Sequence, residues 1–173
     1  SASRHFETLL DIGPDIPPRA VVADKGYDAR ANRQAARQRG SSPKLQVLNT
    51  SLVTAQSGLT LDEARRDHEF WGRLVESAVG AHLANAAASG LCELFYWRDR
   101  NREVDFVVTE HGRPLWLVEC KLGDTDVDRG LRYLHTRFPA AEAWQISARG
   151  GKHYQTPDGI AVAPALEFLR KLV

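Results

Sequence analysis

The chain has 173 residues, of which 43% are hydrophobic and 26% are charged, and its formal net charge is +1. This composition excludes an intrinsically disordered chain, and the near-neutral charge excludes a protein that holds nucleic acid by a general basic excess. No apolar run reaches the roughly 20 residues that cross a bilayer, and two cysteines do not make a disulfide framework, so we expect a cytoplasmic protein without membrane contact.

Residues 1–44 differ in pattern from the rest of the chain. Residues 20–23 are a short apolar strand after two prolines, and residues 24–28 predict a turn. A helix over 29–39 follows, with Asp28 as its expected N-cap. The run Gly-Ser-Ser-Pro at 40–43 then interrupts the pattern. We therefore predict a small strand-turn-helix appendage over 1–44 and a separate domain over 45–173.

The second part predicts alternating helices and strands. Strands are expected over 93–98, 103–109, 114–121, 142–147 and 160–163, after a strand and turn over 45–53. Helices are expected over about 61–89 with a break near 67, from Asp126 or Asp128 to about 137, and over 164–172. The short link at 110–113 predicts an antiparallel hairpin. This order indicates an α/β fold with a mixed central sheet flanked by helices.

Alternation along two strands predicts the faces on which charged side chains lie. The odd-numbered positions of 103–108, which include Asp105, are expected on one face and the even-numbered positions on the other. In 115–121 the odd-numbered positions, which include Glu119 and Lys121, share a face. Charges are depleted in strands and costly to bury unless they are paired or coordinated. Adjacent strands would bring these three side chains together, as a divalent cation with oxygen ligands requires.

A glutamate on the long helix supplies a third candidate ligand. Apolar residues recur at helical spacing over 70–83, and Glu76 lies at the margin of that stripe. Gly72 and Gly80 flank Glu76 at four residues on either side, which predicts a close approach of the helix to the sheet. We therefore predict that Glu76, Asp105 and Glu119 bind a metal ion. Four tryptophans in apolar patterns are expected in the core: Trp71, Trp97, Trp116 and Trp144.

These motifs together resemble a known family. They are Glu76, Tyr-Trp-Arg at 96–98, Glu-Val-Asp-Phe at 103–106 and Val-Glu-Cys-Lys at 118–121. On them, residues 45–173 resemble the C-terminal domain of prokaryotic AAA+ family ATPases, known as domain of unknown function 4143 and similar to PD-(D/E)XK nucleases. The resemblance implies a restriction-endonuclease-like core.

The same resemblance implies roles for individual residues. Asp105 and Glu119 would bind Mg²⁺ or Mn²⁺, with Glu76 as a further contact. Lys121 would position or activate the attacking water, so that Asp105, Glu119 and Lys121 form the catalytic set. Gln145 would lie near this site. No Gly-x-x-x-x-Gly-Lys-Ser/Thr phosphate loop occurs in the sequence, so the ATPase motor of these relatives is not expected here.

A second resemblance concerns the N-terminal part. The segment Val-Ala-Asp-Lys-Gly-Tyr-Asp at 22–28 is similar to part of DDE insertion-sequence transposases, in which the aspartate that matches Asp24 is one of three metal-binding carboxylates. Residues 1–44 do not supply the other two. We therefore interpret them as a transposase-like fragment without phosphoryl-transfer chemistry of its own.

Three functional hypotheses follow. The first is Mg²⁺- or Mn²⁺-dependent hydrolysis of DNA phosphodiesters, by endo- or exonuclease action. The alternative is a non-catalytic interaction or regulatory module that retains the nuclease fold after loss of the ATPase motor and binds a protein partner. A third hypothesis, a transposition accessory, rests on residues 4–44.

Overall fold

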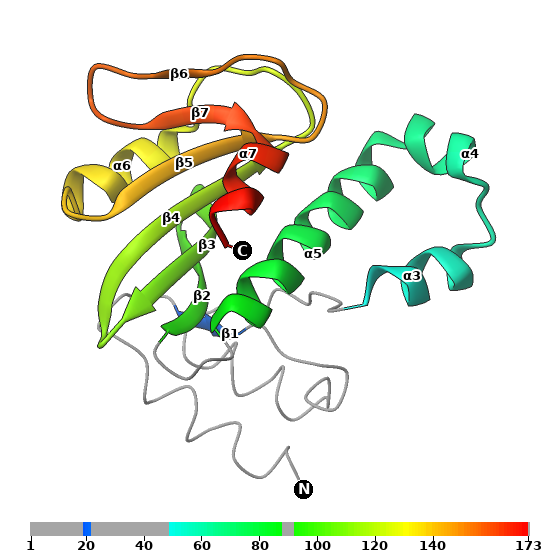
Figure 1. The fold of residues 1–173 in the computed structure, drawn as a ribbon, viewed down its shortest axis with the longest axis horizontal. Coiled ribbons are helices and arrows are strands. Elements are labelled where there is room, and N and C mark those ends of the chain that lie inside the picture. Colours follow the sequence, from blue (N-terminus) through cyan, green and yellow to red (C-terminus); the bar gives the residue numbers. More distant parts are fainter. Residues whose placement is uncertain (1–18, 22–48, 88–91, 173) are drawn as a thin grey trace, which may run out of the picture.

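A computed structural model describes residues 19–21, 49–87 and 92–172 (Figure 1). The helices are α3 (Thr50–Ser57), α4 (Leu61–Arg66), α5 (His68–Ala87), α6 (Arg129–Arg137) and α7 (Ala165–Leu169), followed by a 3-10 helix at Arg170–Leu172. The strands are β1 (Arg19–Val21), β2 (Cys92–Asp99), β3 (Arg102–Glu110), β4 (Arg113–Lys121), β5 (Glu142–Ser147), β6 (Tyr154–Gln155) and β7 (Ala161–Pro164). Over these residues, no helix combines the length and apolar character that a membrane span requires.

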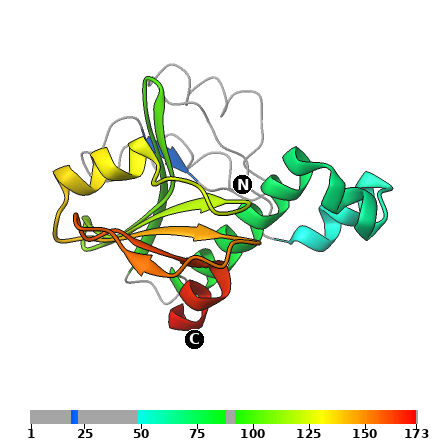
Figure 2. The same cartoon turned by 90° about the horizontal axis from the view of Figure 1, so that it is seen from above.

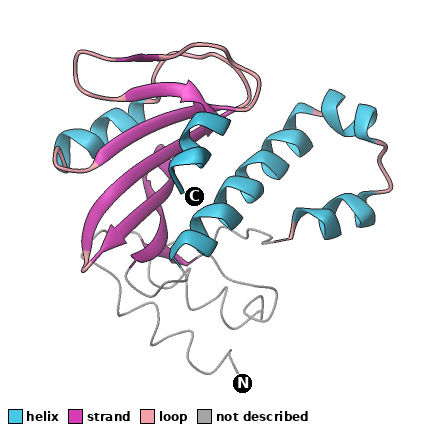
Figure 3. Cartoon of the chain, viewed as in Figure 1, coloured by secondary structure: helices cyan, strands magenta, loops and turns pink. Residues whose placement is uncertain are grey.

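The described strands form one mixed sheet (Figure 3). Their order across it is β1-β2-β3-β4-β5-β7-β6, as labelled in Figure 1. Strands β1 to β4 pair antiparallel, which confirms the predicted hairpin of β3 and β4. Strand β5 runs parallel to β4, and β7 runs parallel to β5. A parallel neighbour needs a crossover connection, and α6 supplies it between β4 and β5. The predicted α/β class with a mixed sheet and helices is confirmed.

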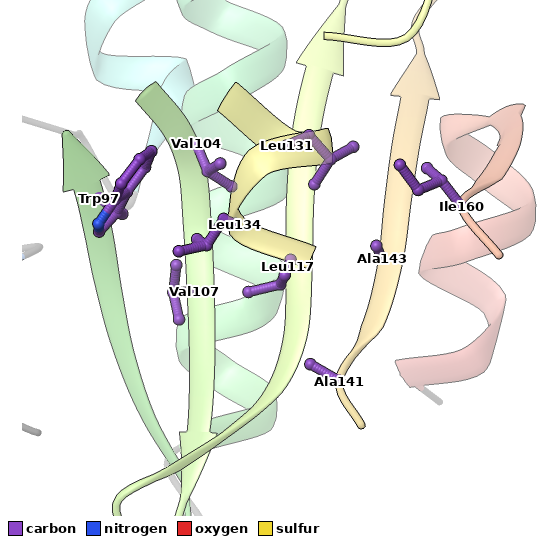
Figure 4. Close-up of a cluster of buried hydrophobic side chains, with 9 residues drawn as sticks. All are labelled: Trp97, Val104, Val107, Leu117, Leu131, Leu134, Ala141, Ala143 and Ile160. Carbon is purple, nitrogen blue, oxygen red and sulfur yellow. The ribbon is translucent and has the colours of Figure 1, made fainter. Parts of the chain in front are cut away.

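Helices cover both faces of this sheet (Figure 2). Helix α6 covers one face, where Figure 4 shows the cluster Trp97, Val104, Val107, Leu117, Leu131, Leu134, Ala141, Ala143 and Ile160. Helices α5 and α7 cover the other face with the cluster Val79, Leu83, Phe106, Val108, Val118, Ile146 and Phe168. Both faces of the sheet are apolar, as expected for a sheet that is covered by helices on each side.

Local capping explains the helices that precede the sheet. Thr60 and Glu63 form a capping box at the start of α4, and Asp67 separates α4 from α5, which confirms the predicted break. The strand predicted within 45–53 is wrong where the structure describes it, because Thr50–Ser57 is helical. Asn49 caps that helix by accepting the N–H of Ser51 at 3.1 Å.

The structure tests only part of what the sequence predicts for residues 1–44, because it describes only residues 19–21 of that segment. Strand β1 pairs with β2 from Arg19–Trp97 to Val21–Phe95, so part of the strand predicted at 20–23 belongs to the main sheet. Asp24, the predicted helix over 29–39 and residues 45–48 lie outside the described residues.

Strand β3 contains a bulge that the alternation pattern did not predict. Phe95 and Trp97 of β2 pair with Val107 and Val104 of β3. The two β2 residues are two positions apart, whereas their partners in β3 are three positions apart. The extra residue lies at Asp105–Phe106. The predicted alternation of 103–108 is therefore wrong: Val104 and Val107 pack under α6, although one is even-numbered and the other odd-numbered.

The start of α6 lies directly against β3. A Cβ atom added at Gly130 would lie 2.2 Å from the carbonyl oxygen of Glu103 and 2.8 Å from its nitrogen. Backbone atoms cannot rotate away as a side chain can, so this contact requires glycine and places the N-terminus of α6 directly against Glu103 of β3.

We expect Gly130→Ala to destabilise the protein by about 2 kcal/mol or more, because overpacking shifts helix and strand apart. Gly151→Ala is the matched control, since nothing lies within 4 Å of its added Cβ. Urea denaturation of both variants tests the contact, and equal stability of the two would contradict it.

Candidate active site

Four predicted site residues line one cavity. Its volume is about 270 Å³, and it is lined by Gly72, Val75, Glu76, Glu103, Asp105, Glu119, Cys120, Lys121 and Leu122. Helix α5 supplies one wall, the start of β3 a second and the end of β4 a third. The structure thus brings Glu76, Asp105, Glu119 and Lys121 to the same place, as the sequence predicts.

Two buried carboxylates hold the ends of β3 and β4 together. The paired register of these strands begins at Phe106–Val118, so Asp105 and Glu119 lie just outside it. The Asp105 carboxylate accepts the N–H of Cys120 at 2.9 Å, and the Glu119 carboxylate accepts the N–H of Asp105 at 3.2 Å. Each side chain thus satisfies a backbone donor of the opposite strand, which explains why strand-end acids with exposures of 6% and 4% are tolerated.

Lys121 bridges the sheet and helix α6. Its Nζ donates to Glu119 Oε1 at 2.8 Å and to Asp128 Oδ2 at 2.9 Å. Asp128 in turn caps α6 by accepting the N–H of Gly130 at 2.7 Å. The lysine is therefore held at the cavity wall by two carboxylates from different elements, and its ammonium faces the buried acids.

The charges at the site shift each other's protonation. Burial, together with the Asp105 carboxylate, raises the pKa of Glu119 to about 8, and the nearby Lys121 ammonium only partly offsets this. Burial by itself would lower the pKa of Lys121, but Glu119 and Asp128 raise it above its ordinary value. The lysine thus remains charged at neutral pH, while Glu119 retains a proton that a bound cation would displace.

The donor chemistry fits a hard divalent cation, although a complete ligand set is not preformed. Asp105 and Glu119 offer carboxylate oxygens, which Mg²⁺ and Mn²⁺ prefer. Among the described residues, however, no group of three or more His, Cys, Asp or Glu side chains is arranged to hold a metal ion. Glu76 lines the same cavity without completing such a group.

Two residues act at the site in ways that the sequence did not predict. The sequence predicts Asp128 as a possible N-cap of α6. Its ion pair with Lys121 forms only because α6 packs against the sheet beside that lysine. Gln145 is 2% exposed and lies behind Asp128, whose N–H it contacts through Oε1 at 2.8 Å. It therefore orients the loop before α6 and is absent from the cavity wall.

The close approach predicted at Gly72 is wrong. An added Cβ would lie 3.9 Å from the Leu122 side chain, which is an ordinary van der Waals contact. A methyl group at this position of the cavity wall would therefore touch Leu122 without displacing it.

Comparison with known proteins gives a family but no function. Residues 71–168, more than half of the chain, match the family described as "Domain of unknown function (DUF4143)". The chain belongs to the DUF4143 family. No curated protein and no solved structure shows significant similarity to it. The DUF4143 match runs from Trp71 to Phe168, so it includes all four predicted site residues and excludes α3 and α4.

The Glu119 carboxyl predicts an unusual dependence of stability on pH in metal-free solution. Its pKa is about 8 in the folded DUF4143 chain and near 4.5 when unfolded, so the folded state holds the proton more tightly. This stabilisation is complete below pH 4.5 and is lost as the pH rises through about 8. The shifted pKa values of Asp128 and Lys121 lie outside this window, below 3.8 and above 10.5.

We therefore expect the melting temperature in EDTA to fall between pH 6 and pH 9. Glu119→Gln, which carries no ionisable proton, should show a smaller fall over the same range. Scanning calorimetry of both proteins is the measurement, and parallel pH profiles would contradict the shift.

Proposed function

We propose that this domain is a metal-dependent nuclease that hydrolyses DNA phosphodiesters. One observation carries the proposal: Asp105, Glu119 and Lys121 meet at the ends of adjacent strands, in a cavity about 270 Å³ in volume. Two acids can hold a divalent cation that activates water, and an ammonium can stabilise the charge that develops during phosphodiester hydrolysis. The likeness of the Glu-Val-Asp-Phe and Glu-Cys-Lys motifs to PD-(D/E)XK nucleases supports the same proposal and a restriction-endonuclease-like fold.

Each residue has a definite task in this proposal. Asp105 and Glu119 would hold Mg²⁺ or Mn²⁺, with Glu76 as a further donor across the cavity. When bound, such an ion polarises the phosphate and lowers the pKa of a bound water. Lys121, held charged by Glu119 and Asp128, stabilises the attacking hydroxide and the negative charge that develops on the phosphate.

We expect the full chain to cleave DNA in the presence of Mg²⁺ or Mn²⁺, and EDTA to abolish the cleavage. Asp105→Ala and Lys121→Ala should each lower the rate on the order of 100-fold or more, since the first removes a ligand of the metal ion and the second removes the ammonium that acts on the reacting phosphate. Gel-based cleavage of plasmid and linear DNA measures this. Asp158→Ala, which removes an exposed carboxylate from the turn before β7, is the control. The proposal fails if the wild type and both site variants behave alike.

A specific observation favours the alternative, a non-catalytic interaction or regulatory module. The carboxylates do not form a preformed metal cluster within the described residues, and Lys121 is engaged by two of them. In that case the ion pairs of Lys121 would only hold the end of β4 against the start of α6, and the domain would bind a protein partner.

Calorimetric titration with Mn²⁺ and Mg²⁺ separates the two candidates. A nuclease should bind the ion at one site, release a fraction of a proton from Glu119 near neutral pH, and lose binding in Asp105→Ala. An inert module should show no heat above background in either protein, and this outcome would favour the alternative.

A further inference from the structure

Trp71 differs from the core residue that its apolar pattern predicts. It is half-buried near the start of α5, and two arginines lie over its ring. The Cζ atom of Arg65, from α4, is 5.7 Å from the ring centroid, and that of Arg149, from the loop after β5, is 5.6 Å away. Both distances are within the range of cation–π contacts, so the indole orients two guanidinium groups.

Backbone hydrogen bonds attach this cluster to the cavity. Arg149 donates its N–H to the carbonyl of Leu122 at 2.9 Å, and Leu122 lines the cavity. The Arg149 guanidinium donates to the carbonyl of Arg65 at 2.9 Å, which joins the loop to the end of α4. Trp71 is followed directly by Gly72, another cavity residue. The two arginines therefore stand at the rim of the candidate active site.

The charge of this cluster is not neutralised within the described part of the chain. Arg65 and Arg149 are both exposed, and neither forms an ion pair with a described carboxylate. The acids nearby are engaged with backbone donors. Asp67 accepts the N–H of Phe70 at 3.0 Å, and Asp124 accepts those of Gly151 and Lys152 at 3.2 Å.

We propose that Arg65, Arg149 and Trp71 form a contact surface for the phosphate backbone of a nucleic acid. Guanidinium groups match phosphate in geometry and charge, and an aromatic ring beside them offers a base a stacking surface. The inference rests on the proposed function and deepens it, because it assigns the residues that bind the nucleic acid and the side of the cavity on which the strand lies.

The test is the affinity of the full chain for labelled DNA in EDTA, measured by fluorescence anisotropy without cleavage. The double variant Arg65→Ala/Arg149→Ala should bind roughly tenfold more weakly and reduce the slope of log affinity against log salt by about two, one for each lost phosphate contact. Hydrolysis of a small diester, bis(p-nitrophenyl) phosphate, should remain unchanged, because it does not reach the rim.

Arg137→Ala is the matched control. Arg137 is also exposed and also lies over an aromatic ring, Phe138, at 5.9 Å, but at the C-terminal end of α6. Its loss should leave DNA affinity unchanged. If the double alanine variant does not fold, Arg65→Lys/Arg149→Lys, which keeps both charges, should retain most of the salt slope while lowering affinity.

The outcomes separate this surface from the proposed function. Equal affinity of the double variant and the wild type would overturn the surface even if DNA is cleaved. If the double variant binds DNA more weakly than the wild type, but the wild type itself cleaves no DNA, the result would support the contact surface and count against the nuclease. Polyglutamate provides the remaining check: if it displaces DNA as well as an unlabelled oligonucleotide does, the site is a general polyanion or acidic-peptide site and the proposal is wrong.

Discussion

A bulge at Asp105–Phe106 marks the end of the regular pairing between β3 and β4, and the backbone N–H groups beyond it need other acceptors. Buried N–H groups without partners are costly, and here the carboxylates of Asp105 and Glu119 accept them from the opposite strand. The same side chains thereby point into the gap between the strand ends. The candidate site thus lies where β3 and β4 separate from each other, while β3 stays paired with β2 and β4 with β5.

This arrangement of the strands places the carboxylates of Asp105 and Glu119 close together in a buried position. Lys121 forms ion pairs with Glu119 and Asp128, and Asp128 is also the N-cap of α6. Because Gly130 allows α6 to contact β3 directly, the helix N-terminus and its cap lie beside the site. The pKa of Glu119 is nevertheless raised to about 8, first because the carboxyl is buried and then because the Asp105 carboxylate lies nearby.

The regular elements could be predicted from the sequence because their periodicity is local. Strand β5 is found at the predicted residues 142–147, and the break of the long helix at 67 follows from the caps around it. Two predictions about the regular elements were wrong. Helix α3 is short, and the sequence at its start, within 45–53, predicts a strand and turn instead of a helix. The bulge in β3 shifts the alternation by one residue, and nothing in the sequence between 103 and 108 signals it.

The sequence by itself determined the class of fold and the hairpin of β3 and β4, because strand and helix periodicity are properties of neighbouring residues. It also marked the acids and lysine of the candidate site, through the motifs around Asp105 and Glu119, although the strand parity predicted for 103–108 is wrong. The tertiary structure decided what those groups contact. Asp128 reaches Lys121 because α6 packs on β3, and Arg65 meets Arg149 at Trp71 although they are far apart in the chain. Such contacts depend on how separate elements pack, and packing is settled by the whole core.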